Sequence, residues 1–222
     1  MVAISFPPEI SISLPEEDTP YGMWLRGELD DYLHLPEAFY SEIIDGEIVV
    51  SRAPAFGHDR IVHAVIFAFN KARVLDESYP WLCSSAGLNL VGVEAGYIPD
   101  LIVLDEQVSR EALQGGGRRL VSDQIEMAVE VTSPSNADTD RRPGKKGKDR
   151  GKWRGYALSG VPYYLLIDRD PKVTAVTLYS IPDAATGAYL QEETWKFGES
   201  IELPEHFDVT IPTDEWLPWD LA

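Results

Sequence analysis

Residues 127–136 have the sequence Met-Ala-Val-Glu-Val-Thr-Ser-Pro-Ser-Asn, which places one acid, Glu130, inside an otherwise apolar run. A short apolar run rich in β-branched residues and followed by turn-forming residues predicts a buried strand, here over residues 124–131. An unpaired carboxylate in such a strand is costly, so Glu130 must be ion-paired, protonated or bound to a metal ion. Glu130 is therefore the most informative residue of the chain.

A second acid, Asp100, stands at the start of another apolar strand in the sequence PDLIVL (residues 99–104), after a proline that fixes the local backbone. The chain has another Pro-Asp pair at residues 182–183, but that pair leads into Ala-Ala-Thr-Gly, a loop that offers no strand to hold an acid. The residue pattern alone favours a functional pair of Asp100 and Glu130 only slightly over a structural role, such as a salt bridge from Glu130 to a helix lysine.

The elements around these acids predict a mixed sheet flanked by helices. Asp45-Gly46 separates two short apolar runs and indicates a tight hairpin. Residues 58–74 and 148–158 predict amphipathic helices, the second of which ends at Gly160. Further strands are predicted over residues 81–93, 97–104, 161–168 and 173–180. This order predicts an α/β or α+β fold in which helices cover both faces of the sheet.

The length of 222 residues suits one domain with additions. Residues 1–40, rich in proline and acids, are interpreted as an N-terminal leader with one short helix near residues 30–35, and residues 41–222 as the single domain. Residues 106–123 include three consecutive glycines and predict a flexible loop with at most one helical turn around Glu111. The tail with Trp195, Trp216 and Trp219 is expected to form late strands and turns that cover the sheet.

The formal net charge of −18 is unfavourable for a protein that binds nucleic acid, because phosphates are attracted by Lys and Arg. The charge is uneven, however, since eight of the 19 basic residues lie in the segment 141–154. An acidic body with one basic segment suggests a local contact with an anion. A solvated loop explains the segment equally well on charge alone.

Several other classes are excluded by the sequence. The single cysteine, Cys83, excludes an internal disulfide and a multi-cysteine zinc site and fits a reducing compartment. No apolar run has the length of a membrane span, and the N-terminus lacks the features of a signal peptide, so a cytoplasmic protein is expected. The chain has no Gly-x-Ser-x-Gly elbow, no phosphate-binding loop, no His-Glu-x-x-His pattern and no dinucleotide fingerprint.

Together these stretches resemble the PD-(D/E)XK nuclease signature and, more narrowly, the Uma2 family of restriction endonucleases, also called DUF820. The resemblance covers residues 40–170 and rests on five ordered blocks. The last two are the most specific, because Glu-Val-x-Ser-Pro-Ser and Lys-x3-Tyr-Ala-x2-Gly-Val-Pro-x-Tyr occur together in that family. The blocks are SEIIDGEIVV (41–50), His58, YIPDLIVLDE (97–106), MAVEVTSPSN (127–136) and KWRGYALSGVPYYLLID (152–168).

The resemblance implies a restriction-endonuclease-like core and a metal-dependent endonuclease that acts on DNA. In such an enzyme, Asp100, Glu130 and the Val131 carbonyl would hold Mg²⁺ or Mn²⁺, which prefer hard oxygen ligands. The motif expects a lysine two residues after Glu130, where this chain has Thr132, whose hydroxyl brings no positive charge. The resemblance suggests that the lysine has moved to the following helix, at Lys152.

Four residues are weaker candidates for the site. Lys148 is the alternative to Lys152, and both share one helix face with Tyr156, which is expected to pack with its hydroxyl near the site. Glu42 matches an acid of the family and could add a metal ligand, although a solvated hairpin residue is the favoured interpretation. His58 matches a family histidine, but a lone histidine near a helix start is more often a capping or packing residue.

Two rival interpretations remain open. The same fold could serve as a scaffold with weak or no catalysis that binds nucleic acid or a protein partner, which the −18 charge and Thr132 both favour. Alternatively, the chain could be a nuclease subunit whose DNA affinity comes from a partner chain. The resemblance and the late tryptophans also suggest a homodimer, and no contact with a membrane is expected.

Overall fold

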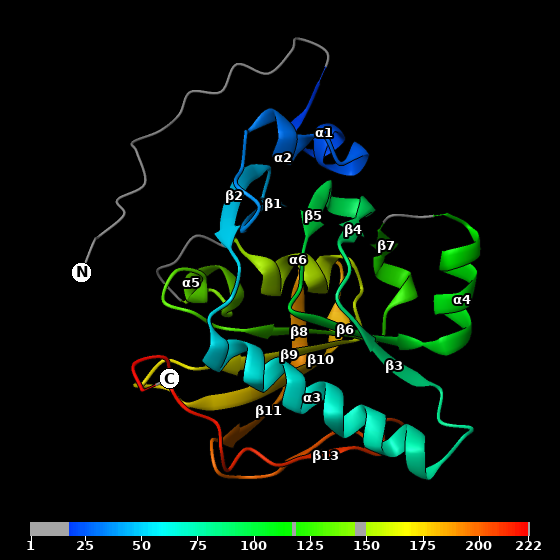
Figure 1. Ribbon diagram of the computed structural model, residues 1–222, viewed down its shortest axis with the longest axis vertical. Coiled ribbons are helices and arrows are strands. Elements are labelled where there is room, and N and C mark those ends of the chain that lie inside the picture. Colours follow the sequence, from blue (N-terminus) through cyan, green and yellow to red (C-terminus); the bar gives the residue numbers. More distant parts are fainter. Residues whose placement is uncertain (1–17, 117–118, 145–149, 222) are drawn as a thin grey trace.

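The computed structural model describes residues 18–116, 119–144 and 150–221, which form two main sheets and the helices around them (Figure 1). The helices are α1 (Pro20–Arg26), α2 (Leu29–Tyr32), α3 (Phe56–Leu75), α4 (Glu106–Gln114), α5 (Ala137–Asp140) and α6 (Lys152–Leu158), with short 3-10 turns η1 (Val91–Val93) and η2 (Ser122–Gln124). The strands are β1 (Phe39–Ile44), β2 (Glu47–Arg52), β3 (Trp81–Ser84), β4 (Leu88–Leu90), β5 (Ala95–Tyr97), β6 (Leu101–Asp105), β7 (Leu120–Val121), β8 (Met127–Val131), β9 (Tyr163–Asp168), β10 (Ala175–Asp183), β11 (Ala188–Lys196), β12 (Ile201–Glu202) and β13 (Thr210–Ile211).

The larger sheet has six strands in the order β11-β10-β9-β8-β6-β3. Only β8 and β9 run parallel in it, and the segment that connects them contains α5 and α6. Parallel neighbours need such a crossover, whereas antiparallel neighbours such as β9 and β10 can be joined by a short connection. The smaller sheet has the order β2-β1-β5-β4-β7, and β12 and β13 form a separate pair. The fold is therefore a mixed α+β architecture with mixed sheets flanked by helices, as the sequence predicts.

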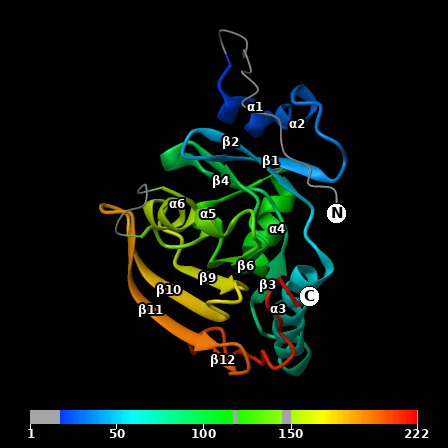
Figure 2. The ribbon, with the colours of Figure 1, turned by 90° about the vertical axis from the view of Figure 1, so that its left-hand side faces the viewer.

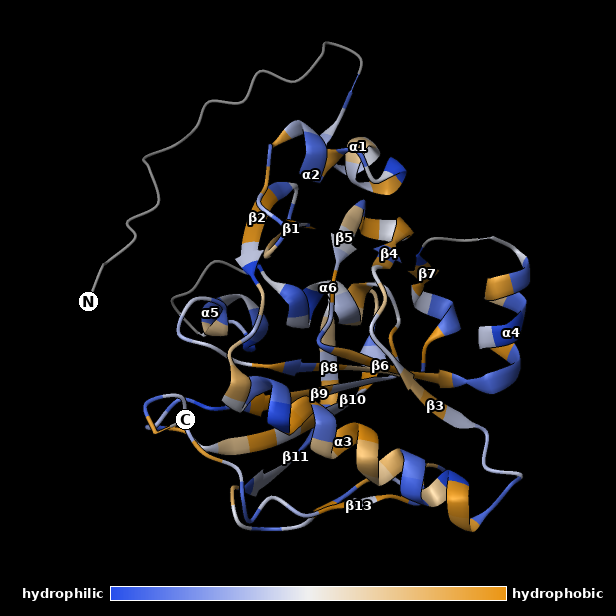
Figure 3. Ribbon diagram, viewed as in Figure 1, coloured by the Kyte–Doolittle hydropathy of each residue, from blue (hydrophilic) through white to orange (hydrophobic). Residues whose placement is uncertain are grey.

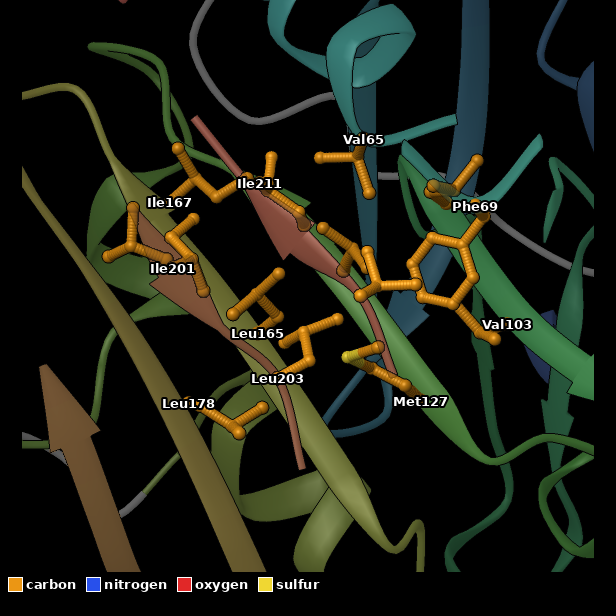
Figure 4. Close-up of a cluster of buried hydrophobic side chains, with 14 of the residues drawn as sticks. Val65, Phe69, Val103, Met127, Leu165, Ile167, Leu178, Ile201, Leu203 and Ile211 are labelled. Carbon is orange, nitrogen blue, oxygen red and sulfur yellow. The ribbon is translucent and has the colours of Figure 1, made fainter. Parts of the chain in front are cut away.

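One face of the larger sheet is an apolar core covered by α3. Alternate residues of β8 point to this face, and Met127, Val129 and Val131 are all at most 1% exposed. Helix α3 supplies Val65 and Phe69, which lie one turn apart and meet these strands (Figure 4). Apolar and polar residues both occur along α3 (Figure 3), and its apolar residues are not confined to the buried side, since Phe56 and Phe67 are exposed.

The opposite face of the larger sheet is covered by α6, which lies between the two sheets (Figures 1 and 2). Trp153, Tyr156 and Ala157 of α6 belong to a core that includes Ala128 of β8 and Tyr97 of β5. Glu130 alternates with Val129 and Val131 along β8, so its side chain lies on the α6 side. The strand thus turns its apolar residues toward α3 and its acid toward the space between the sheets.

The hairpin predicted at Asp45-Gly46 is confirmed, since β1 and β2 pair through Ile44 and Glu47 on either side of it. Asp45 and Gly46 both have positive φ values, 54° and 78°. This is the turn conformation that an Asp-Gly pair allows and that matches the twist of two antiparallel strands.

The N-terminal residues that the structure describes are part of the fold and not a detached leader. The predicted short helix near residues 30–35 corresponds to α2 at Leu29–Tyr32, and α1 precedes it. Trp24 of α1 is 2% exposed and its Nε1 donates to the Ser41 carbonyl at 2.8 Å. Its ring occupies the space over Gly96, where a Cβ would lie 2.3 Å from the ring, so the sheet accepts this tryptophan because residue 96 has no side chain.

Two other predictions differ from the structure. The strands predicted over residues 81–93 and 97–104 are broken, and β5 ends before Pro99-Asp100 while β6 begins after it. The loop prediction for residues 106–114 is wrong, because they form helix α4. Asp105 caps that helix by accepting from the Gln107 backbone at 2.7 Å. An acid at this position is a helix start signal, but the three glycines that follow the helix favoured a loop in the sequence-based prediction. Residues 117–118 lie outside the described part.

Within the described ranges, no helix combines the length and apolar character that crossing a membrane requires.

Candidate active site

Glu130 and Lys152 form a buried ion pair between the two sheets. Glu130 is 1% exposed on β8, and Lys152, the first residue of α6, is 3% exposed. The Lys152 Nζ lies 3.0 Å from Glu130 Oε1. It also lies 2.9 Å from Oε1 of Glu42 on β1. One ammonium group therefore joins a carboxylate of the larger sheet to a carboxylate of the smaller sheet.

Tyr156 completes this arrangement one helical turn after Lys152. Its hydroxyl donates to Glu130 Oε1 at 2.7 Å, so the predicted shared face of the two helix residues is confirmed. Lys148, the alternative lysine, lies outside the described residues. Glu42 is 2% exposed and also accepts from the Ile98 backbone at 2.7 Å, so its interpretation as a solvated hairpin residue is wrong.

Asp100 lies in the break between β5 and β6, where the backbone turns it toward the end of β8. Its Oδ2 accepts from the Val131 backbone at 2.7 Å and lies 3.1 Å from Nε2 of His58. The two atoms are within hydrogen-bonding distance, and the tautomer of His58 sets which of them donates. His58 is 5% exposed at the start of α3 and therefore contacts the candidate acid rather than capping the helix.

The five side chains of Glu42, His58, Asp100, Glu130 and Lys152 line one cavity of about 280 Å³. The hydrogen bonds of Asp100 all use Oδ2 and those of Glu130 all use Oε1, which leaves Asp100 Oδ1 and Glu130 Oε2 without protein partners in the described chain. The rest of the wall comes from β1, β2, the loop after it, the Ser133–Asn136 turn, Arg169 and Trp219.

The model of the Uma2 family, with the description "Putative restriction endonuclease", matches residues 29–214. The chain belongs to the Uma2 family. A crystal structure of "a putative nuclease belonging to DUF820" from Anabaena variabilis ATCC 29413 has a similar fold, with a TM-score of 0.58 and 18% sequence identity. The match covers 86% of this chain and 97% of that one. No functionally curated protein matches the chain.

Around the Lys152 ammonium of this Uma2 protein, the acids Glu42, Glu130 and Asp140 outnumber the single cation. Burial raises the pKa of Glu130 well above its usual range, and Asp140, Asp100 and Glu42 add to the rise while Lys152 opposes it. Burial alone would lower the pKa of Lys152, but the surrounding carboxylates outweigh it and hold the pKa well above its usual range. The cluster therefore favours a charged lysine and has an excess of negative charge.

Asp140 is a member of this cluster that the sequence analysis missed. It is fully buried at the end of α5, and its Oδ2 has no hydrogen-bond partner among the described residues. Burial raises the pKa of Asp140 to about 7, while Lys152 opposes the rise and Asp100 and Glu42 add to it. The sequence around it, Asn-Ala-Asp-Thr-Asp, has no apolar periodicity, so nothing in the pattern indicates that this acid is buried.

Thr132, at the position of the motif lysine, is used entirely within the protein. It is fully buried, its hydroxyl donates to Asp168 Oδ1 at 3.1 Å, and it accepts from the Arg169 backbone at 2.9 Å. Thr132 follows β8 and Asp168 ends β9, and the ends of neighbouring parallel strands lie at one edge of a sheet. That rule could have identified Arg169 as a neighbour of the site from the sequence.

The described part of the basic segment 141–154 is largely paired with acids of the same chain. Arg141 binds Asp168 through Nε at 2.6 Å and Asp170 through Nη2 at 3.0 Å. Further ion pairs in the described part of this segment join Arg142 to Glu192, Arg150 to Glu47, and Lys152 to Glu42 and Glu130. Residues 145–149 lie outside the described part.

Proposed function

We propose that this Uma2 protein is a Mg²⁺-dependent endonuclease that hydrolyses phosphodiester bonds in DNA. The observation that carries the proposal is the meeting of Asp100, Glu130 and Lys152 at one cavity, although they come from three separate elements. The description of the family and the name of the structural neighbour support a nuclease as the class of activity.

The donor atoms at the cavity fit a hard divalent cation. Asp100 Oδ1 and Glu130 Oε2 are carboxylate oxygens without protein partners, and Mg²⁺ is commonly bound by one or two carboxylates together with waters and substrate phosphates. The N–H and C=O of one strand residue point toward the same neighbour, so the Val131 carbonyl faces the Asp100 side. No group of three or more His, Cys, Asp and Glu side chains in the described ranges is arranged to hold a metal, so the proposed set has two side chains and one carbonyl.

A bound Mg²⁺ or Mn²⁺ would supply a water of lowered pKa and stabilise charge on the phosphoryl oxygens. Lys152 supplies the fixed positive charge that Thr132 does not, and a preorganised ammonium in a buried site stabilises negative charge that develops in the transition state. Tyr156 and Lys152 both occupy Glu130 Oε1 and so fix the carboxylate with its other oxygen free. His58 fixes Asp100 in the same way, and Glu42 anchors the lysine.

The proposal is tested by calorimetric titration of Mg²⁺ and Mn²⁺ into the wild type, Asp100→Ala and Glu130→Ala, together with cleavage of plasmid DNA. We expect the wild type to bind metal and cleave, and both variants to lose the measurable heat and the cleavage while remaining folded by circular dichroism. Glu193→Ala removes an exposed acid of β11 and is the matched control, with wild-type behaviour in both assays.

Equal metal binding by the wild type and Glu130→Ala would contradict the proposed metal site, and full cleavage by either alanine variant would contradict the catalytic assignment. The specific observation that favours the rival scaffold is that Glu130 already has a cation partner inside the protein. A wild type that binds DNA but cleaves neither DNA nor RNA in Mg²⁺ or Mn²⁺ would support that rival.

A further inference from the structure

Arg169 differs from the other buried charged residues because no acid of the described chain is paired with it. It follows β9, is 3% exposed and forms part of the cavity wall. Its Nε donates to the Leu217 carbonyl at 3.1 Å, and neither terminal guanidinium nitrogen has a partner in the described part of the protein. In the described residues, the side-chain polar atoms that lack both a partner and contact with solvent all belong to residues other than Arg169. The two terminal nitrogens of Arg169 are therefore in contact with solvent.

Arg141 provides the contrast, since both arginines lie beside Asp168. Arg141 donates hydrogen bonds to Asp168 and Asp170, and these bonds raise its pKa although burial opposes the rise. Burial lowers the pKa of Arg169, and no carboxylate opposes that effect. A guanidinium stays protonated in proteins, so the protein keeps a desolvated positive charge at the cavity without compensating it internally.

The backbone of Arg169 is held from two sides, which fixes where its side chain starts. Its N–H donates to the Thr132 hydroxyl at 2.9 Å, and its carbonyl accepts from the Trp219 backbone at 3.2 Å. Leu217 thus binds the guanidinium of Arg169, and Trp219 binds its backbone. Thr132, at the position of the motif lysine, has a role in this arrangement. Its hydroxyl binds the backbone just after β9, from which the Arg169 side chain projects.

We propose that Arg169 is a substrate-binding residue whose two free guanidinium nitrogens bind a backbone phosphate of the nucleic acid strand in the cavity. Planar guanidinium groups bind phosphate oxygens through paired, charge-assisted hydrogen bonds. The carboxylates of Glu42, Asp100 and Glu130 repel a phosphate, and Arg169 supplies an attraction at the same wall. A cavity of about 280 Å³ has room for a phosphodiester group.

This inference rests on the proposed function, and binding without metal separates the two. Affinity for a fluorescein-labelled DNA duplex is measured in EDTA at several salt concentrations for the wild type, Arg169→Met and Arg169→Lys. Each phosphate contact contributes about 0.9 to the slope of log affinity against log salt. We expect Arg169→Met to bind about tenfold more weakly and to lose about 0.9 from that slope, a change that a purely structural role would not produce.

Arg169→Lys tests the same point if the methionine variant does not fold. It keeps the charge but not the planar pair of donors, so we expect a wild-type slope with weaker affinity. Arg110→Ala removes one exposed positive charge from α4, away from the cavity, and serves as the control with unchanged slope.

Each outcome of the binding series decides between the two proposals. If Arg169→Met lowers the salt slope of DNA affinity but the wild type never cleaves, the phosphate contact is supported and the endonuclease proposal is overturned. Cleavage by the wild type together with an unchanged slope and KM in folded Arg169→Met overturns the phosphate contact alone. A folded Arg169→Lys with wild-type affinity, or a wild type that binds no duplex, also overturns it.

Discussion

Both faces of the larger sheet carry an apolar core, but in the described chain only the α6 face also buries a cluster of charged groups. On the α3 face, Val129 of β8 belongs to a core of apolar residues. On the α6 face, Glu130, the next residue, meets Lys152, Tyr156 and the acids around them. Both faces are buried to the same degree, since Val129 and Glu130 are each 1% exposed.

Burial therefore has two different energetic effects in this protein. Apolar burial on the α3 face stabilises the fold by roughly 25 cal/mol per Å² removed from water. On the α6 face, several carboxylates around one lysine are removed from water. The cost of this desolvation can exceed the attraction between the charges, so the cluster contributes little to stability. We therefore expect substitutions on the two faces to separate stability from activity.

The largest effect on stability is expected from Phe69→Ala on the α3 face. Phe69 is fully buried, so its truncation is expected to lower the free energy of unfolding by about 3–5 kcal/mol. Cleavage per folded molecule should stay at the wild-type level. Urea denaturation followed by tryptophan fluorescence measures the first quantity, and active-site-normalised plasmid cleavage measures the second.

Glu130→Gln on the α6 face is the matching variant and should show the reverse pattern. The amide keeps the shape of the side chain while Glu42 still neutralises Lys152, so the loss of stability should be smaller than for Phe69→Ala. Cleavage should be lost. Equal losses of stability in the two variants would contradict the contrast between the faces.

Asp140→Asn tests the excess negative charge through the dependence of stability on pH. The folded pKa of Asp140 is raised to about 7 from its ordinary 3.8, so the folded state holds a proton that the unfolded state releases. This contribution is fully present below pH 4 and is lost as pH rises to 7. The asparagine variant lacks this loss and should be more stable than the wild type above pH 7, by up to about 4 kcal/mol.

Unfolding free energies at several pH values in EDTA measure this difference. Asp138→Asn is the control, since Asp138 is an exposed acid of the same short helix and its replacement should leave the pH profile unchanged. A constant difference between Asp140→Asn and the wild type from pH 4 to pH 8 would mean that Asp140 is ionised throughout.

Gly155→Ala should have the smallest effect on stability while still affecting the site. A Cβ at residue 155 would lie 2.1 Å from the hydroxyl of the buried Tyr97, and we expect α6 to shift to relieve the clash. Overpacking of this kind costs about 1–3 kcal/mol, and the shift moves Lys152 and Tyr156, which are on the same helix. We expect a lower kcat, with partial recovery in the double variant Tyr97→Phe/Gly155→Ala. A wild-type kcat in the single variant would show that the position of α6 does not control the site.

Much of the fold and of the site could be predicted from local sequence signals. Asp45-Gly46 predicts the hairpin through its turn conformation, and the periodicity of residues 58–74 predicts α3 to within two residues at its start. The metal ligands and the catalytic role of Lys152 remain proposals. The proximity of Glu130 to Lys152, however, follows from an acid in an apolar strand and from the helix face that Lys152 shares with Tyr156.

The rest depends on contacts between residues that are far apart in the chain. Trp24 packs over Gly96, 72 positions further on, and no local pattern indicates that a glycine leaves this space. The burial of Glu42 and Asp140 also depends on where the smaller sheet and α5 dock. The order of the strands could have placed Arg169 near the site, but only the three-dimensional surroundings show that no described acid is paired with it.

The turn between β1 and β2 has a consequence for the order in which the protein matures during synthesis. Asp45 Oδ2 accepts from the Gly151 backbone at 2.8 Å, and Gly151, at φ 113°, immediately precedes Lys152. Glu42 and Glu130 precede Lys152 in the chain, and the contact of Asp45 requires Gly151. The ion pairs of Lys152 with the two acids can therefore form only after the start of α6 has been synthesised and docks on the hairpin.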